Sequence, residues 1–292
     1  MSGLPHGVSQ LDTPLGPAVE LVAPGGGIAR IAINGAQLLS WVPEGDSEVI
    51  WVSAAARTQP GKSLRGGTPV CWPWFGAHPA DASKPAHGFV RGLPWQIVST
   101  SSGDAGTEAT FAFTTAGNHR ELWPYEADVH LTTRLDDEGL SLALETLNTG
   151  AEPLPLTQAL HTYFRISDIA DVAVDGLDGS PYIDAIGEWQ RRIQQGAVTF
   201  AGEVDRIYLG ETSSIAIRDP GLGRSILISS QGSGSAVVWN PWIAKSERLG
   251  DMGPDGYRTM VCVETANAAD DVVSLAPRAT HRLTARYQVA VL

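Results

Sequence analysis

The amino-acid sequence predicts an all-β protein, built as a large antiparallel β-sandwich. Short apolar or alternating runs recur along the chain between turn residues, and runs of about four to eight residues are typical of strands. Many of these runs are rich in β-branched residues, and no periodic stretch is long enough for a helix of three turns. Because no linker, composition shift or internal repeat divides the chain, residues 1–292 are expected to form one domain.

The first expected strands lie in the N-terminal hundred residues. Each is a short apolar run, and a PGGG turn separates the first two. They are expected at 18–22, 28–33, 38–42, 48–52 and 95–99.

The strand pattern continues to the C-terminus after a long loop. The runs at 107–114, 127–135 and 140–148 alternate well enough to give one buried and one solvated face, which favours antiparallel strands. Further strands are expected at 156–166, 172–177, 183–185, 198–201, 214–218, 225–229, 236–239, 259–265, 272–275 and 282–289. Two packed antiparallel sheets are the architecture that accommodates them.

Composition and charge limit the classes of partner. The formal net charge is −12 and the isoelectric point is about 4.9, whereas nucleic acids and anionic membranes require a surplus of Lys and Arg. We therefore expect no nucleic-acid partner and no membrane partner. The N-terminus has no leader-like pattern, and the two cysteines, Cys71 and Cys262, stand in apolar strand-like contexts typical of buried free thiols. A cytoplasmic location and a monomer are expected.

The loop at 64–92 has the composition of a pocket. It places Arg65 and Arg91 near its ends, with His87 close to the second arginine and several aromatic residues, including Trp74, between them. Two glycines follow Arg65, which allows the backbone to approach a ligand closely. The planar guanidinium of arginine binds carboxylate or phosphate oxygens in a bidentate manner. Two surface arginines would give the same pattern, so an anion site is one of two interpretations.

His161 is a candidate proton-transfer residue. In a strand through LTQALHTYFRI it would share its face with Ala159, Tyr163 and Arg165, which is a polar face rather than a core face. Histidine donates or accepts a proton near neutral pH. A structural histidine remains the alternative.

Glu264 is a second candidate, because it ends the otherwise apolar run MVCVE. Partial desolvation would raise the pKa of its carboxyl group toward the range of a general base. Asp205 supplies a further polar group, and Trp74, Trp239 and Trp242 offer flat apolar faces of the kind that stack on sugar rings. A solvated strand end is the alternative for Glu264.

Other enzyme classes lack their signatures in this sequence. The phosphate-binding loop GxxxxGK[ST], a GxGxxG after a strand, HExxH and paired CxxC motifs are all absent. The spacing of His78 and His87 is weak evidence for a metal site. Neither a metal nor a cofactor is expected.

Taken together, the motifs resemble those of the hexose-6-phosphate mutarotase family, the glucose-6-phosphate 1-epimerases, within the aldose 1-epimerase or galactose-mutarotase-like superfamily. The similarity extends over much of the chain in the family's order. The matching stretches are RGGTPVCWPWFG at 65–76, HGFVRGLPW at 87–95, LHTYFRISDI at 160–169, VDGLDGSPYID at 174–184, VDRIY at 204–208, VVWNPWIAKSERLGDM at 237–252 and MVCVETAN at 260–267.

This resemblance implies a galactose-mutarotase-like supersandwich and an isomerase that interconverts the α and β anomers of a hexose 6-phosphate without a redox cofactor. It implies that His161 and Glu264 are the catalytic residues. It further implies that Arg65 and Arg91 select the phosphate, while His87 and Asp205 contact the sugar.

Three alternatives to this function stay open. They are a mutarotase of unphosphorylated aldoses, a non-catalytic carbohydrate-binding β-sandwich, and a glycosidase, which would need two carboxyl groups at the scissile bond. The sequence also leaves open whether Pro73 and Pro241 follow cis peptide bonds.

Overall fold

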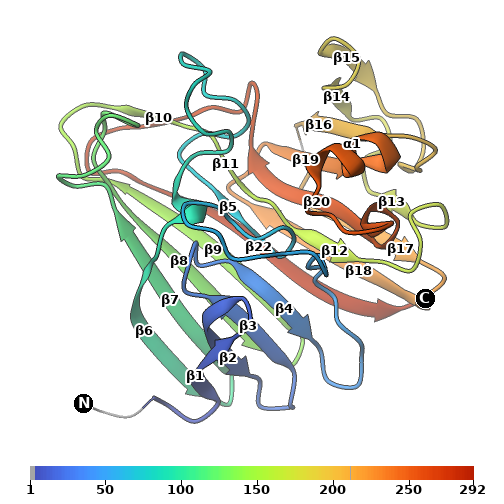
Figure 1. Ribbon diagram of the computed structural model, residues 1–292, viewed down its shortest axis with the longest axis horizontal. Coiled ribbons are helices and arrows are strands. Elements are labelled where there is room, and N and C mark those ends of the chain that lie inside the picture. The colour runs from blue at the N-terminus through green and yellow to red at the C-terminus, as the bar shows by residue number, and fades with distance from the viewer. Residues whose placement is uncertain (1–3, 211) are drawn as a thin grey trace.

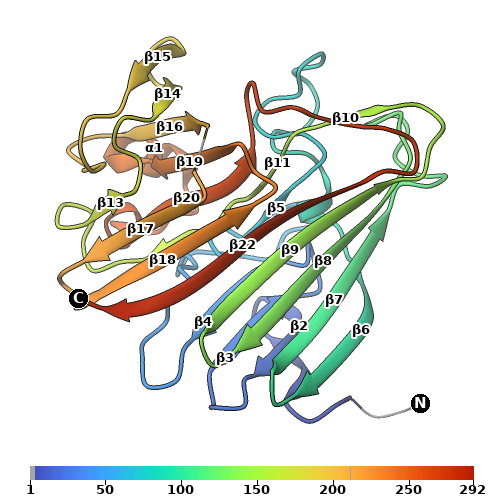
Figure 2. The same cartoon turned by 180° about the vertical axis from the view of Figure 1, so that it is seen from behind.

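The computed structural model describes residues 4–210 and 212–292, and it confirms the all-β class. Two eight-stranded antiparallel sheets form most of the molecule, with a four-stranded sheet and a two-stranded pair beside them. We name the two large sheets after a central strand of each. The β20 sheet has the order β15-β14-β16-β19-β20-β11-β5, with β12 also paired to β20, and the β22 sheet has the order β13-β17-β18-β22-β9-β8-β7-β6 (Figures 1 and 2).

The strands of the β20 sheet are β5 (Val70–Cys71), β11 (Gln158–Leu160), β12 (Tyr163–Arg165), β14 (Pro181–Asp184), β15 (Gln190–Ile193), β16 (Val204–Leu209), β19 (Ser235–Asn240) and β20 (Met260–Asn267). Those of the β22 sheet are β6 (Gln96–Gly103), β7 (Gly106–Thr114), β8 (Ala127–Asp136), β9 (Gly139–Asn148), β13 (Ala173–Asp175), β17 (Ser214–Asp219), β18 (Arg224–Gln231) and β22 (Thr280–Val291).

The smaller sheets are β1 (Val8–Thr13), β2 (Gly16–Val22), β3 (Ile28–Ala32) and β4 (Leu38–Val42), and the pair β10 (Leu154–Leu156) and β21 (Val273–Leu275). The helices of the described residues are α1 (Trp242–Leu249) and the 3-10 turns η1 (Val90–Gly92) and η2 (Gly256–Thr259). None of them is long and apolar enough to span a membrane.

Alternation along β20 separates the core from the other face of its sheet. Val261 and Val263 are buried in the main hydrophobic core, whereas Met260 and Cys262 belong to a second, smaller cluster. Because successive strand residues point to opposite faces, Glu264 lies on the Cys262 face, away from the main core. The apolar pattern of this strand therefore supports both the core and a functional face.

The expectation of one continuous strand at 156–166 is wrong, because the backbone pairing of this segment is interrupted twice. Its first part, β10, pairs with β21 in a separate sheet, while β11 and β12 both pair with β20. Between β11 and β12 the amide of His161 donates to the carbonyl of Pro69, 3.1 Å away. The predicted alternation of side chains nevertheless holds across this break, with Leu160 and Phe164 in the main core and Ala159 and Tyr163 in the second cluster.

Two other expected strands, 48–52 and 198–201, are also wrong. These segments make only isolated bridges, Ile50 to Phe164, Val52 to Gly66 and Val174 to Val198. Conversely, β1, β15 and β16 were not expected, because their sequences VSQLDT, QRRI and VDRIYL carry polar residues that obscure the period-2 pattern.

Both cysteines are buried free thiols, as expected. The Trp72–Pro73 peptide bond, whose isomer the sequence leaves open, is cis.

Candidate active site

A cavity of about 760 Å³ lies on the second-cluster face of the β20 sheet. Residues far apart in the sequence meet in its wall, because the loop at 61–93, strands β16, β19 and β20 and helix α1 all contribute to it. Six of the seven predicted site residues line it: Arg65, His87, Arg91, His161, Asp205 and Glu264.

The seventh predicted residue, Trp74, requires a correction. Its side chain is buried within the main core, where the ring packs near Phe89 and the indole N–H donates to the carbonyl of Pro85 at 2.9 Å. Trp74 is not among the residues that line the cavity. The tryptophans that line the cavity are instead Trp189 and Trp239, the latter on β19.

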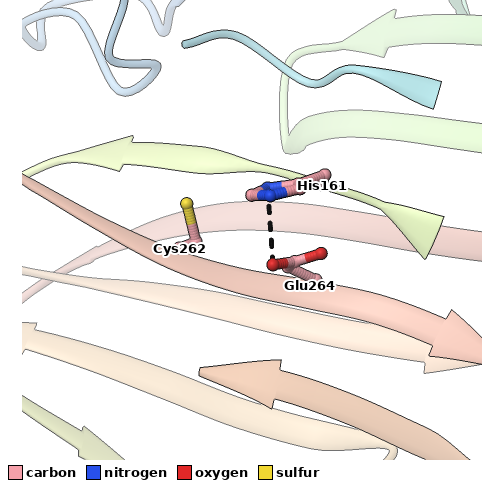
Figure 3. Close-up of side chains that lie close together, drawn as sticks. All are labelled: His161, Cys262 and Glu264. Carbon is pink, nitrogen blue, oxygen red and sulfur yellow. Dashed lines mark ion pairs between the residues drawn. The ribbon is translucent and has the colours of Figure 1, made fainter. Parts of the chain in front are cut away.

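His161 and Glu264 face each other in the cavity wall. Leu160 pairs with Thr265 and Tyr163 pairs with Cys262, so the break between β11 and β12 places His161 opposite Glu264. The Nδ1 atom of His161 lies 3.4 Å from Oε1 of Glu264, and Figure 3 shows the two side chains pointing toward one another. Nδ1 of His161 and Oε2 of Glu264 are buried and have no hydrogen-bond partner among the described residues. Buried polar atoms are rarely left unpaired in proteins, so this pair is suited to a ligand.

Burial shifts both members of the pair toward their neutral forms. The His161 side chain is buried in the cavity wall, and desolvation lowers the pKa of its imidazole well below the ordinary value. Desolvation raises the pKa of the Glu264 carboxyl group well above its ordinary value, and the nearby Asp205 carboxylate raises it further.

Positive charge in the cavity acts on the same pair. Beyond the effect of burial, the charges of Arg91 and Arg65 lower the pKa of the His161 imidazole further. Arg91 has the opposite effect on Glu264, because it stabilises the carboxylate and so lowers its pKa. The protonation of the pair therefore depends on what else binds beside these arginines.

The two arginines lie on the loop side of the cavity and are half-buried. Arg65 Nε donates to the Asp251 carboxylate at 2.9 Å, and its Nη1 donates to the Tyr163 hydroxyl at 3.0 Å. Arg91 Nη2 donates to the carbonyl of Ala86 at 2.9 Å. In a chain of net charge −12, this part of the cavity is a local concentration of positive charge.

His87 reaches the cavity through an unusual backbone conformation. Its φ angle is +62°, and the following Gly88 has φ of +72°. The ring centroid lies 5.7 Å from that of His161. Burial, with the charges of Arg91 and Arg65 adding to it, lowers the pKa of His87 to about 3, so the imidazole is neutral at physiological pH.

On the opposite side, Asp205 of β16 forms an ionic cluster with a lysine that the sequence reasoning did not single out. Lys245 Nζ lies 2.8 Å from Glu203 Oε1 and 3.4 Å from Asp205 Oδ2. Burial raises the pKa of Asp205, although Lys245 opposes this effect. Lys245 stands on α1, inside the stretch VVWNPWIAKSERLGDM at 237–252, and its place in that matching stretch is the signal that could have identified it.

Tyr163 was also missed as a site residue. Its ring lies parallel to the His161 imidazole, and the edge of Trp239 meets both rings. In the expected strand, Tyr163 lies on the same face as His161. That shared face is the sequence signal that could have identified Tyr163 as a site residue.

Comparisons with known proteins find similar sequences and similar structures. The family model described as "Aldose 1-epimerase" matches residues 17–288. A protein of Escherichia coli (strain K12) named "Putative glucose-6-phosphate 1-epimerase" is 40% identical over 243 residues, which are 83% of this chain and 80% of the relative. A protein of the same name from Cenchrus ciliaris is 34% identical over 258 residues, 85% of this chain and 77% of the relative.

Solved structures are similar as well. The crystal structure of "a putative mutarotase" from Salmonella typhimurium superposes with a TM-score of 0.90 at 34% identity, covering 100% of this chain and 96% of that one. A galactose mutarotase-like protein from Lactobacillus casei, 18% identical, shares the fold with a TM-score of 0.72 over 94% of this chain and 100% of its own.

Proposed function

Because this chain belongs to the aldose 1-epimerase family, we propose that it is a hexose-6-phosphate mutarotase, an isomerase that interconverts the α and β anomers of hexose 6-phosphates, chiefly glucose 6-phosphate. One observation carries the proposal. A buried histidine and a buried glutamate face each other at 3.4 Å in a cavity that also contains Arg65 and Arg91. Anomer exchange needs one proton donor and one proton acceptor, and this pair supplies both.

The reaction proceeds through the open-chain sugar. Glu264, as the carboxylate, accepts the proton of the C1 hydroxyl, while His161, as the imidazolium, donates a proton to the ring oxygen. The bond between C1 and the ring oxygen breaks, and the aldehyde forms. Rotation about the C1–C2 bond followed by the reverse proton transfers closes the ring as the other anomer. Each positioned acid or base accelerates such a step by roughly 10²–10⁴-fold.

The protonation of the pair couples this chemistry to the phosphate. Burial favours the neutral imidazole and the protonated carboxyl, whereas the proposed roles require the proton on His161. A phosphate dianion between Arg65 and Arg91 offsets the positive charge that disfavours the imidazolium. The substrate's own phosphate therefore raises the pKa of His161, the group that must be protonated to act as the acid, 3.4 Å from Glu264.

Recognition of the phosphate is assigned to the two arginines. Arg65 already lies between the Asp251 carboxylate and the Tyr163 hydroxyl, and a bound phosphate replaces the carboxylate as its anionic partner. Guanidinium groups suit this role because they bind phosphate oxygens bidentately at any physiological pH.

The sugar ring is assigned to the opposite part of the cavity. Neutral His87 and the carboxylate of Asp205 hydrogen-bond hydroxyl groups, and Trp239 offers an apolar ring to the sugar face. Lys245, held by Glu203 and Asp205, adds a further donor on this side.

Anomer exchange measured by NMR, with glucose 6-phosphate and with free glucose, tests the proposal. The wild-type enzyme should accelerate exchange of the phosphorylated sugar, and His161→Ala and Glu264→Gln should lose that acceleration while remaining folded by circular dichroism. Equal rates on both sugars would favour the alternative of an unphosphorylated-aldose mutarotase. Binding without any exchange would favour a carbohydrate-binding protein, and near wild-type rates in either variant would contradict the catalytic assignment.

The cellular setting follows from the proposed substrate. Sugar phosphates are made and consumed in the cytoplasm, and two buried free thiols suit a reducing compartment. We propose a cytoplasmic, monomeric enzyme with the hexose 6-phosphate as its partner.

A further inference from the structure

Cys262 stands beside the His161–Glu264 pair, and the proposed reaction does not use it. Cys262 and Glu264 are two residues apart on β20 and point to the same face, opposite His161 (Figure 3). One ligand atom from each residue, the imidazole nitrogen, the thiol sulfur and a carboxylate oxygen, lies within 4.8 Å of the other two. All three side chains are buried.

We propose that His161, Cys262 and Glu264 form an inhibitory site for a thiophilic divalent cation of the Zn²⁺ or Cd²⁺ type. The inhibitory effect rests on the proposed function of the same pair, whereas the binding of the cation does not.

The donor set fits such a cation. Imidazole nitrogen, thiolate sulfur and carboxylate oxygen are the ligands of zinc in proteins, which takes four of them in a tetrahedron. With bond lengths of about 2.0 Å to nitrogen and oxygen, two such ligands stand about 3.3 Å apart. The 3.4 Å between His161 Nδ1 and Glu264 Oε1 matches this separation, and the thiol needs to approach by about 1 Å, a movement within reach of side-chain rotation. The cavity supplies space for water as the fourth ligand.

A second observation points to a ligand at the same place. Nδ1 of His161 and Oε2 of Glu264 have no hydrogen-bond partner among the described residues, although His161 is 8% exposed and Glu264 is 2% exposed. The ligand set also balances the charge of a divalent cation. Binding displaces the thiol proton, and any proton on the carboxyl group, to solvent, so that a thiolate and a carboxylate balance the two positive charges.

Inhibition follows from which atoms the cation occupies. With Nδ1 and a carboxylate oxygen bound to metal, His161 and Glu264 are no longer available for the proton transfers to and from the sugar. Because the site is soft, Mg²⁺, which prefers oxygen ligands, should bind poorly to it. A chelator should restore activity fully.

Metal titrations with a matched pair of cysteine variants test this inference. Binding of Zn²⁺ and Cd²⁺ is measured calorimetrically without sugar, and mutarotation of glucose 6-phosphate is measured over the same metal range. Cys262→Ser should bind Zn²⁺ roughly tenfold or more weakly, since even outer-shell changes at metal sites cost 10–100-fold in affinity. Cys71→Ser, which alters the other buried thiol, should behave as wild type.

A spectroscopic measurement on the wild-type protein needs no variant. Cd²⁺ should produce the ultraviolet charge-transfer band of a cadmium–thiolate bond with release of protons, whereas Mg²⁺ should produce neither. Absence of this band, or equal Zn²⁺ affinity in Cys262→Ser and wild type, would overturn the inference. Metal binding in a protein that fails to exchange anomers would instead contradict the proposed function alone.

Discussion

The phenol ring of Tyr163 lies parallel to the imidazole of His161, with centroids 4.9 Å apart and an interplanar angle of 7°. The hydroxyl group of the same tyrosine lies 3.0 Å from Nη1 of Arg65. On its other side Tyr163 stacks on Trp51, whose indole N–H donates to Thr259. The buried side chain of Tyr163 therefore contacts both His161, the proposed acid, and Arg65, which is proposed to bind the phosphate. Tyr163 is a positioning residue for each of them.

Two substitutions should separate these contacts. Tyr163→Phe keeps the stacked ring but loses the charge-assisted hydrogen bond to Arg65, worth about 1.5 kcal/mol or more, so KM for glucose 6-phosphate should rise roughly tenfold with little change in kcat. Tyr163→Leu removes the ring, and kcat should fall by roughly 10²-fold, the cost of small misplacements of a catalytic group. Steady-state kinetics of both variants, with Tyr182→Phe as the control, measures the split. An unchanged KM in Tyr163→Phe and an unchanged kcat in Tyr163→Leu would contradict the two positioning roles.

Arg65→Ala should impair the enzyme only on phosphorylated sugars. Loss of a charge-assisted contact costs about 1.5–3 kcal/mol, so KM for glucose 6-phosphate should rise by about 10–150-fold, while exchange of free glucose stays almost unchanged. Arg65→Lys keeps the charge without the planar fork and should give an intermediate KM. Arg134→Ala, at a half-exposed arginine of β8 outside the cavity, is the matched control. Equal losses on both sugars would refute the phosphate assignment.

The pH profile of kcat should differ between the two sugars. Burial and neighbouring positive charge lower the pKa of His161, and the proposed acid is active only while protonated, so activity is lost as pH rises through this pKa. A bound phosphate dianion stabilises the imidazolium and raises the pKa. The alkaline decline of kcat should therefore occur at higher pH with glucose 6-phosphate than with glucose. Because the pair titrates as a unit, full profiles for both substrates are required, and coincident declines would exclude the coupling.

Gly88→Ala should unfold the loop that carries His87 and Arg91. Gly88 has φ of +72°, and a Cβ atom there would lie 1.8 Å from the carbonyl oxygen of Trp72. We expect a loss of about 3–5 kcal/mol in the free energy of unfolding, measured by chemical denaturation.

Gly117→Ala is the control for this loss. It has a similar φ of +73° with no atom within 4 Å of the added Cβ, so it should cost only about 1–2 kcal/mol. Similar losses of unfolding free energy in Gly88→Ala and Gly117→Ala would show that the close approach of the added Cβ to the Trp72 carbonyl oxygen is not destabilising.

The all-β class and most of the strands could be predicted, because strand periodicity is a local property of the sequence. Runs with clean alternation, such as 107–114 and 127–135, correspond closely to β7 and β8. The break within 156–166 occurs where a backbone hydrogen bond comes from a distant segment. The amide of His161 bonds to Pro69 rather than to a ladder partner, and no pattern within 156–166 records that bond.

The chemical groups available to this protein could be identified without its fold: a histidine and a glutamate suited to proton transfer, arginines suited to an anion, and the motifs that resemble one enzyme family. Which of these groups meet depends on how the chain folds. It brings His161 to 3.4 Å from Glu264, adds Tyr163 and Lys245 to the site, and leaves Trp74 in the core. The physical reason is that side-chain direction follows from local alternation, whereas proximity follows from sheet register, which pairs β11 and β12 with a strand some 100 residues away.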